Sequence, residues 1–327
     1  AFRQRYREAL ALFEKALALA RSQNQRIIAL SLFNDIATLL DELAREEPPL
    51  RFQAISYYSQ IIEQCEKGDG TKDYHQMVLG NRGWSRINLP SEAQPQGYRD
   101  AIGDLEAAIK ICGDSPFFLR NRVHHYDHLG LAHTELVRYE KGHVEPAIEC
   151  FRKSIELARE LPDPLEESRA LHNLGILFLI LGEPEALEEA AECLWAALEP
   201  RQGRVKEEWE TLGTLLAVRA RYPVPFGAME DDEQLLAELT GLAPRLVQSE
   251  EYDRALQTYD YIFELVRHRP ERTDRELIQH TDSALELAER VWSCAERPAT
   301  QHHYAQHIAM LAARRALLAC LNDEPAI

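Results

Sequence analysis

Two short stretches decide the fold, Leu171-His172-Asn173-Leu174-Gly175 and Ala190-Ala191-Glu192-Cys193-Leu194-Trp195-Ala196-Ala197. In the second stretch, Ala190, Leu194 and Ala197 are spaced by four and three residues, which places them on one face of a helix. In the first stretch, Gly175 lies inside an apolar helical pattern. Because glycine in a helix costs about 1 kcal/mol, its presence there indicates that two backbones come close. Together the stretches predict a hairpin of two packed helices.

The small–large–small triplet recurs along the chain. The copies are Ala9/Phe13/Ala16, Ala54/Tyr58/Ile61, Ala101/Leu105/Ala108, Ala147/Phe151/Ser154, Ala190/Leu194/Ala197 and Ala255/Tyr259/Ile262. The leading alanines of the first five copies are 45, 47, 46 and 43 residues apart, and the sixth follows after 65. Most copies follow another amphipathic segment, often with a glycine after an apolar residue, as at Gly130 and Gly213. We therefore expect an all-α solenoid of helical hairpins with about fourteen helices.

Composition limits the classes of function. The net charge of −17 argues against a protein that binds the phosphate backbone of nucleic acids. The longest apolar run, within Leu174 to Leu181, is far shorter than the roughly 20 residues of a membrane-spanning helix. The six cysteines form no CxxC pair, and we interpret them as reduced residues of the helix packing. We expect a cytoplasmic protein without nucleic-acid or membrane partners.

The hairpins resemble tetratricopeptide repeats, most plainly at His172-Asn173-Leu174-Gly175 with Ala190, Leu194 and Ala197. The resemblance covers nearly the whole chain. It implies a right-handed solenoid whose concave surface binds proteins. The units here are longer than the usual repeat of about 34 residues, and only the stretch from Leu239 to Ile262 has the ordinary spacing.

We expect two regions, a repeat array over residues 1–270 and a C-terminal helical pair over 271–327 that packs on the end of the array. The array is interrupted near 201–232, where an extra helix over about Arg204 to Ala220 precedes a loop rich in proline. The last helix is apolar around much of its circumference. We expect it to contact a neighbouring domain of a longer parent chain, or a second copy, through Ile308, Leu311, Leu317 and Leu321.

The first helix of each hairpin is expected to line the concave surface. The residues that we predict to bind a partner there, called the wall residues below, are Asn34, Thr38, Trp84, His124, Asp127, His128, Arg169, His172 and Asn173. Trp84 is the best anchor, unless it belongs to the core of its own hairpin. His124 and His128 are four residues apart, and with His172 they would suit a metal ion. We interpret them instead as polar residues of a solvated surface and expect no metal or other cofactor.

No motif of a common enzyme class is present, whether a phosphate-binding loop, a dinucleotide fingerprint, a zinc-protease helix or a hydrolase nucleophile elbow. We therefore expect a scaffold, not an enzyme, that recognises a peptide or protein on its concave surface. One alternative, which rests on resemblance, is the sensor or regulatory domain of a larger caspase-like peptidase or signalling ATPase. A helical metal-dependent enzyme is a further alternative, and an RNA-reading repeat is disfavoured by the acidic charge.

Overall fold

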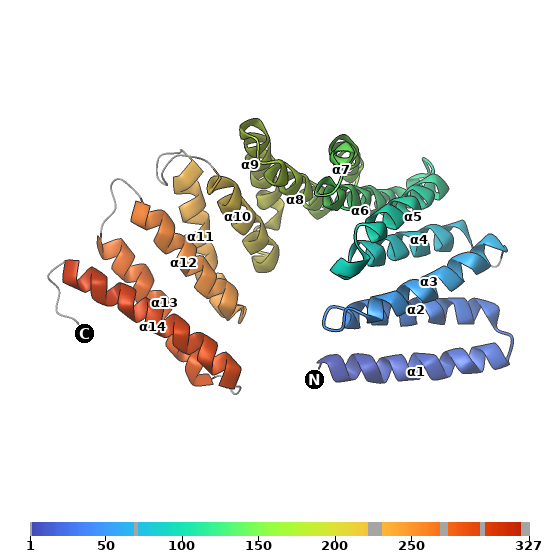
Figure 1. Cartoon of the computed structure of the whole chain (residues 1–327), viewed down its shortest axis with the longest axis horizontal. Helices are drawn as coiled ribbons and strands as arrows, with labels where there is room; N and C mark the ends of the chain where they lie inside the picture. Colours follow the sequence, from blue (N-terminus) through green and yellow to red (C-terminus); the bar gives the residue numbers. More distant parts are fainter. Residues whose placement is uncertain (1, 69–70, 222–230, 269–273, 295–297, 322–327) are drawn as a thin grey trace. The chain divides into compact units, whose positions relative to one another are not determined.

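A computed structural model describes residues 2–68, 71–221, 231–268, 274–294 and 298–321. Within these ranges the chain forms fourteen α-helices and no β-strand (Figure 1). The predicted all-α hairpin fold is therefore confirmed. The chain divides into two compact units, residues 1–180 and 181–327. The regional boundary that we expect near residue 270 stays a prediction.

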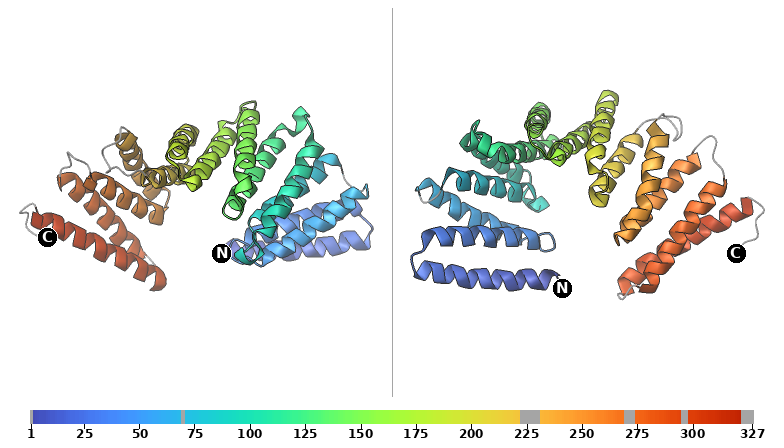
Figure 2. Two further views of the ribbon diagram at one scale, coloured as in Figure 1. Left: turned by 45° about the horizontal axis from the view of Figure 1, so that its top comes forward. Right: turned by 180° about the vertical axis from the view of Figure 1, so that it is seen from behind.

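Unit 1 is a stack of consecutive helices. They are α1 (Phe2–Ser22), α2 (Arg26–Leu43), α3 (Leu50–Glu66), α4 (Lys72–Ile87), α5 (Gln96–Cys112), α6 (Leu119–Val137), α7 (Val144–Ala158) and α8 (Pro164–Leu181). Each helix from α1 to α6 packs on the one that follows it, and α4 also touches α6 (Figure 2). Short 3-10 turns at Ser91–Ala93, Pro116–Phe118 and Lys141–His143 lengthen the connections before α5, α6 and α7. Units of more than 40 residues arise from these long helices and turns.

The repeated triplets form the core of the hairpins. Ala101, Leu105, Ala147 and Phe151 are fully buried, at 0% exposure. Gly83 of α4 and Gly130 of α6 lie against the large triplet residue of the next helix, Leu105 and Phe151. An added Cβ on Gly130 would lie 2.6 Å from Cε1 of Phe151, closer than side chains pack. The glycine therefore makes room for a neighbouring side chain, the Phe151 ring, whereas the sequence pattern had suggested contact with a neighbouring backbone.

Unit 2 comprises α9 (Pro184–Leu198), α10 (Val205–Arg219), α11 (Asp231–Gln248), α12 (Tyr252–His268), α13 (Asp274–Cys294) and α14 (Pro298–Leu321). The predicted extra helix is α10, which packs on both α9 and α11. The proposed close approach at Gly213 is wrong, because no atom lies within 4 Å of a Cβ added there. Gly213 instead borders a hollow of about 250 Å³ lined by Leu216, Tyr261 and Leu265. The extra helix breaks the alternation of first and second helices, so no large residue faces this glycine.

The C-terminal helices form the end of unit 2, where α13 packs on α12 and α14 packs on α13. Leu311 is buried, at 4% exposure, and Ile308 is half-buried. The side chains of Leu317 and Leu321 lie outside the described part of the chain, as do residues 222–230 of the predicted interruption. The interface that we expect on α14 stays a prediction. Among the described helices, none has both the length and the apolar character needed to cross a bilayer.

Candidate partner-binding face

The wall residues all lie in unit 1, on alternate helices. Asn34 and Thr38 lie on α2 and Trp84 lies on α4. The remaining wall residues are on α6 (His124, Asp127 and His128) and on α8 (Arg169, His172 and Asn173). The repeat register thus assigned them to the first helix of successive hairpins, as the sequence predicted.

Side chains from one first helix reach the next. Between α2 and α4, Nδ2 of Asn81 donates to Oδ1 of Asn34 over 3.5 Å. Between α6 and α8, Nε of Arg169 and Nδ2 of Asn173 both donate to the Asp127 carboxylate, each over 2.9 Å. These contacts tie Asn34, Asp127, Arg169 and Asn173 to side chains of the neighbouring first helix.

Trp84 connects α4 to α6. Its ring stacks on the imidazole of His128, with centroids 4.6 Å apart and planes 28° from parallel. The indole nevertheless remains 39% exposed, so it is not a core residue of its own hairpin. Stacking fixes the ring while one part of it stays open to solvent, which is the arrangement of an aromatic anchor at a protein interface.

Two buried carboxylates lie beneath this face. Asp127 is 1% exposed and Glu166 is 7% exposed. Glu166 accepts from Nε2 of His124 over 3.0 Å and forms an ion pair with Arg169 at 2.8 Å. Buried carboxylates need such partners, because desolvation of an unpaired charge is costly. The sequence did not single out Glu166, since an acid in the first turn of a helix is usually a response to the helix dipole.

A hollow of about 210 Å³ opens between α4 and α6. Its lining residues are Met77, Gly80, Asn81, Arg120, Asn121, His124, His125 and His128. None of these side chains is a carboxylate, and Arg120 brings a permanent positive charge to the hollow in a chain whose net charge is −17. His128, the stacking partner of Trp84, lines it. The Trp84 indole therefore lies against a residue that lines the hollow.

Two histidines at the hollow are held neutral. Burial, with smaller contributions from the charges of Arg169 and His124, lowers the pKa of His128 to about 3. Burial, with a smaller contribution from His124, lowers the pKa of His125 to about 4. Nε2 of His125 lies 2.7 Å from Oε1 of Gln76, and because an amide oxygen only accepts, the ring donates through this nitrogen.

These pKa values predict a loss of stability in mild acid. In the unfolded chain both histidines bind a proton below about pH 6.5, whereas in the folded chain they stay neutral until about pH 4 or below. The unfolded state therefore binds more protons, and stability falls as the pH drops from 7 to 5. Urea midpoints at the two pH values would measure this fall, and His125→Gln should make it smaller. Equal pH dependence in the variant and the wild type would contradict this assignment.

The histidines do not form the metal site that their spacing suggested. Within the described residues, no group of three or more His, Cys, Asp or Glu is arranged to hold a metal ion. His124 is engaged with Glu166, and the rings of His124 and His128 lie 6.5 Å apart. The proposed third ligand, His172, is buried at 8% exposure. The alternative of a helical metal-dependent enzyme gains no support from this geometry.

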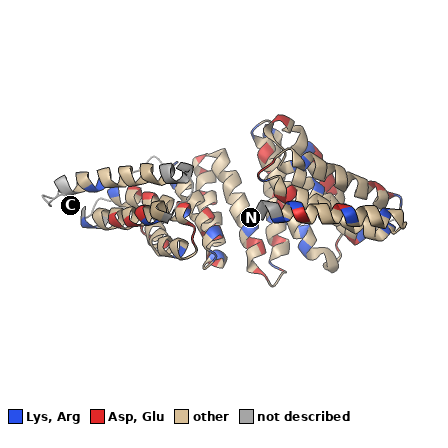
Figure 3. Cartoon of the chain, turned by 90° about the horizontal axis from the view of Figure 1, so that it is seen from below, with Lys and Arg blue, Asp and Glu red and all other residues tan. Residues whose placement is uncertain are grey.

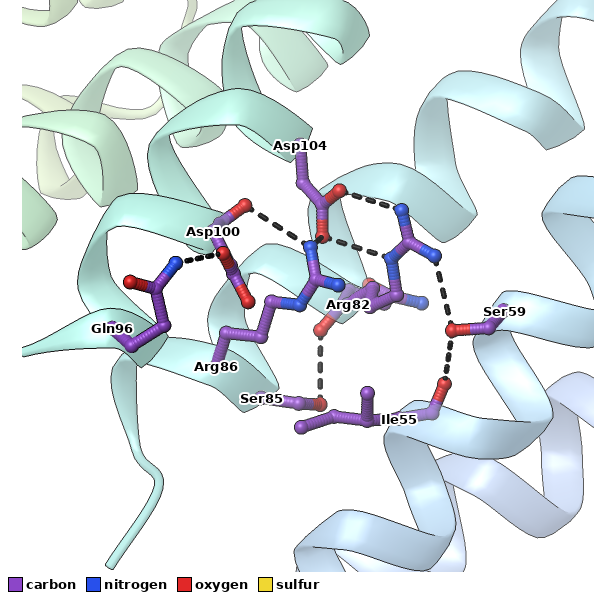
Figure 4. A network of polar contacts seen from close by, with 9 residues as sticks. Ile55, Ser59, Arg82, Ser85, Arg86, Gln96, Asp100 and Asp104 are labelled. Carbon is purple, nitrogen blue, oxygen red and sulfur yellow. Dashed lines mark hydrogen bonds and ion pairs between the residues drawn. The ribbon is translucent and has the colours of Figure 1, made fainter. Parts of the chain in front are cut away.

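A second polar network, which the sequence analysis missed, joins α3, α4 and α5 (Figure 4). Arg82 donates to the Asp104 carboxylate through Nε at 2.9 Å and through a terminal nitrogen at 2.6 Å. Arg86 reaches the same carboxylate at 2.6 Å, and the second terminal nitrogen of Arg82 donates to Ser59 at 3.0 Å. Asp104 is 5% exposed. It follows the leading alanine of its triplet by three residues, the position that Cys150 occupies in α7.

No protein-family model matches the sequence, and no curated protein matches it. Among solved structures, BtubC (BKLC) from P. vanneervenii is similar, with a TM-score of 0.58 and 15% sequence identity over 74% of this chain and 92% of BtubC. The two chains share a helical fold. This similarity shows the fold alone, and the tetratricopeptide subtype stays a prediction.

Two further structures align over most of the chain, but their TM-scores are too low to show a shared fold. A circular tandem repeat protein with a novel repeat topology has a TM-score of 0.33 and 16% identity, over 96% of this chain and 84% of that one. Nro1, a hypoxic regulator of sterol synthesis and nuclear import adaptor, has a TM-score of 0.39 and 14% identity, over 97% of this chain and 95% of Nro1.

Proposed function

We propose that this chain is a protein-binding scaffold without catalysis of its own, and that unit 1 holds a peptide or protein segment on its wall residues. The observation that carries the proposal is the half-exposed Trp84, stacked on His128 beside a polar hollow. Because the wall side chains are already fixed by contacts between helices, a partner loses little free energy in ordering them. The same pre-formed surface is expected to form the concave side of the solenoid.

The chemistry of the face indicates what a partner would present. An apolar side chain would pack on the exposed part of the Trp84 indole. A polar or acidic side chain would enter the hollow, where Arg120 is exposed and has no carboxylate partner among the described residues. The acidic net charge of −17 still disfavours a nucleic acid as the partner.

A cytoplasmic location belongs to the same proposal. Cys65, Cys112 and Cys150 are unbridged and buried in the described helices. Burial raises the pKa of the Cys112 thiol to about 11 and that of Cys150 to about 12, so both remain protonated and unreactive at neutral pH. Such thiols are compatible with a reducing compartment.

Trp84→Ala is expected to weaken partner binding strongly, by about 2 kcal/mol or more for an aromatic anchor. The matched control is Trp292→Ala, because Trp292 is 46% exposed but belongs to α13 of unit 2 and is not a wall residue. Proteins captured from the source lysate by wild type and both variants would be compared by quantitative mass spectrometry, and affinities for the recovered partner would be measured by calorimetry.

A partner of the wall should be retained by wild type and Trp292→Ala and lost by Trp84→Ala, with unchanged helix content in all three. Equal recovery by both variants would place binding elsewhere on the chain and contradict the proposal. Loss in both variants would indicate a general effect on the fold, which circular dichroism would detect.

A further inference from the structure

Four polar side chains occupy equivalent positions on the four first helices of unit 1. They are Asn34 on α2, Asn81 on α4, His128 on α6 and Asn173 on α8, and they are 47, 47 and 45 residues apart. The leading alanines of the triplets that follow them are 47, 46 and 43 residues apart. The four side chains therefore keep the period of the repeat, and they are called the polar column below.

The polar column faces away from the second helices. Asn81 and His128 each precede by two residues a glycine, Gly83 or Gly130, that lies against the next helix. Two residues turn an α-helix by about 200°, so a side chain at this position lies on the opposite side of its helix. All four members of the polar column are half-buried. They lie outside the core of the hairpins, where a partner can reach them.

Each member of the polar column keeps an unused hydrogen-bonding atom. A carboxamide can donate twice and accept twice, but Asn34 accepts only from Asn81, and Asn173 donates only to Asp127. Nδ2 of Asn34 and the Oδ1 atoms of Asn81 and Asn173 have no partner among the described residues, and all three are open to solvent. Nε2 of His128 is also open, whereas its Nδ1 is buried. The polar column therefore offers both donors and acceptors to a ligand.

The chemistry of the polar column matches a peptide main chain. Three of its members are amides, and burial keeps His128 neutral at pH 7 by lowering its pKa to about 3. Such a column selects neither an anion nor a cation. A peptide group presents one donor and one acceptor, which an amide side chain can pair with. In a helix these groups bond to one another, whereas in an extended segment they are free. The matching ligand is thus extended and not helical.

We propose that the polar column binds the main chain of an extended segment of a partner protein. This mode of binding rests on the proposed function, because it uses the same face of unit 1, and it specifies the conformation of the bound segment. Peptide N–H groups would donate to Oδ1 of Asn81 and Asn173, and a peptide carbonyl would accept from Nδ2 of Asn34. One side chain of the segment would pack on the Trp84 indole, which stacks on His128. Main-chain contacts are the same for every sequence, so Trp84 and the hollow would select among segments.

A single-stranded nucleic acid also presents donors and acceptors, on the edges of its bases. Its phosphates need cations alongside, and the polar column itself carries no charge. Figure 3 shows Asp and Glu side chains on helices of both units, in a chain whose net charge is −17. These charges favour a polypeptide over a nucleic acid as the ligand.

An enriched random peptide is the probe for a direct test. Displayed peptides of about 12 residues, long enough when extended to reach several first helices, would be enriched on the full chain. The best peptide would be synthesised with a fluorescent label and with an N-methyl group on each peptide nitrogen in turn, which removes one main-chain donor and keeps every side chain. Anisotropy titrations should show losses of about fivefold or more at interior positions. Asn81→Ala should cause a similar loss, and the control Gln53→Ala, at an exposed amide on the second helix α3, should cause none.

Coupling between the two changes separates a direct contact from a general effect. The N-methyl group that removes the bond to Asn81 should cost little in Asn81→Ala, because the bond is already absent there. Equal costs of every N-methyl group in Asn81→Ala and wild type would overturn the proposal. So would a helical conformation of the bound peptide in NMR spectra, failure of any peptide to enrich, or tighter binding of a mixed-sequence single-stranded RNA than of the peptide.

The test also separates this inference from the proposed function. If Trp84→Ala weakened peptide binding while Asn81→Ala and the N-methyl groups did not, main-chain recognition would be wrong and the anchor at Trp84 would stand. If Asn81→Ala and the N-methyl groups showed the expected coupling while Trp84→Ala bound as wild type, the polar column would stand without that anchor. Circular dichroism of each variant would show that its helix content is unchanged.

Discussion

Gly130→Ala is expected to lower the free energy of unfolding by roughly 2–3 kcal/mol through overpacking. The new Cβ would lie 2.6 Å from Cε1 of Phe151 and 2.8 Å from both Cδ1 and Cζ. Phe151 is fully buried, so its ring cannot move aside without displacing α6 from α7. Urea unfolding followed by circular dichroism would measure the loss, and hydrogen exchange would locate it in unit 1.

The matched control is Gly213→Ala, which makes the same change at the same position of the hairpin pattern. No atom lies within 4 Å of the added Cβ, and the glycine is inside α10. This variant should be more stable than wild type by about 0.5–1 kcal/mol, because alanine favours a helix. Phe151→Leu should recover part of the stability lost in Gly130→Ala. A Gly130→Ala chain as stable as the wild type would contradict the close helix contact.

This pair of glycines shows how far the sequence could predict the fold. The triplet spacing identified the buried faces, and Ala54, Ala101, Ala147 and Ala190 are all 0% exposed. The sequence pattern is the same around Gly130 and Gly213, yet only Gly130 touches a neighbour. What faces a residue depends on the order of helices beside it, and the extra helix α10 changes that order in unit 2.

The sequence predicted only part of the candidate face. The rest was missed for a similar reason. Repeat register places Trp84 and Asn173 on first helices, but it does not say which partner orients each side chain. Glu166 and Asp104 were missed because a carboxylate on an amphipathic helix usually faces water. Asp104 is buried against arginines of another helix, and Glu166 is buried against an arginine one turn further along its own helix. The hydrophobic pattern of a single helix does not show such contacts.

Asp104→Asn should lower the free energy of unfolding by about 3 kcal/mol, because it leaves two arginines without their shared anion. The side chain of Asp104 is 6% exposed, and those of Arg82 and Arg86 are 16% and 19% exposed. The asparagine keeps the shape of the side chain but not its charge, so packing changes little. Urea denaturation at neutral pH, with tryptophan fluorescence as a second signal, would measure the difference.

Asp100→Asn is the control for this variant, since Asp100 is exposed one turn earlier on α5 and Arg86 binds its backbone carbonyl, which the substitution retains. It should change stability by less than about 0.5 kcal/mol. Replacing all three members together, Asp104→Leu with Arg82→Met and Arg86→Met, should recover most of the loss, because an apolar cluster needs no compensating charge. If Asp104→Asn were no more destabilising than Asp100→Asn, the arginines would already be solvated, and the network would not hold α3, α4 and α5 together.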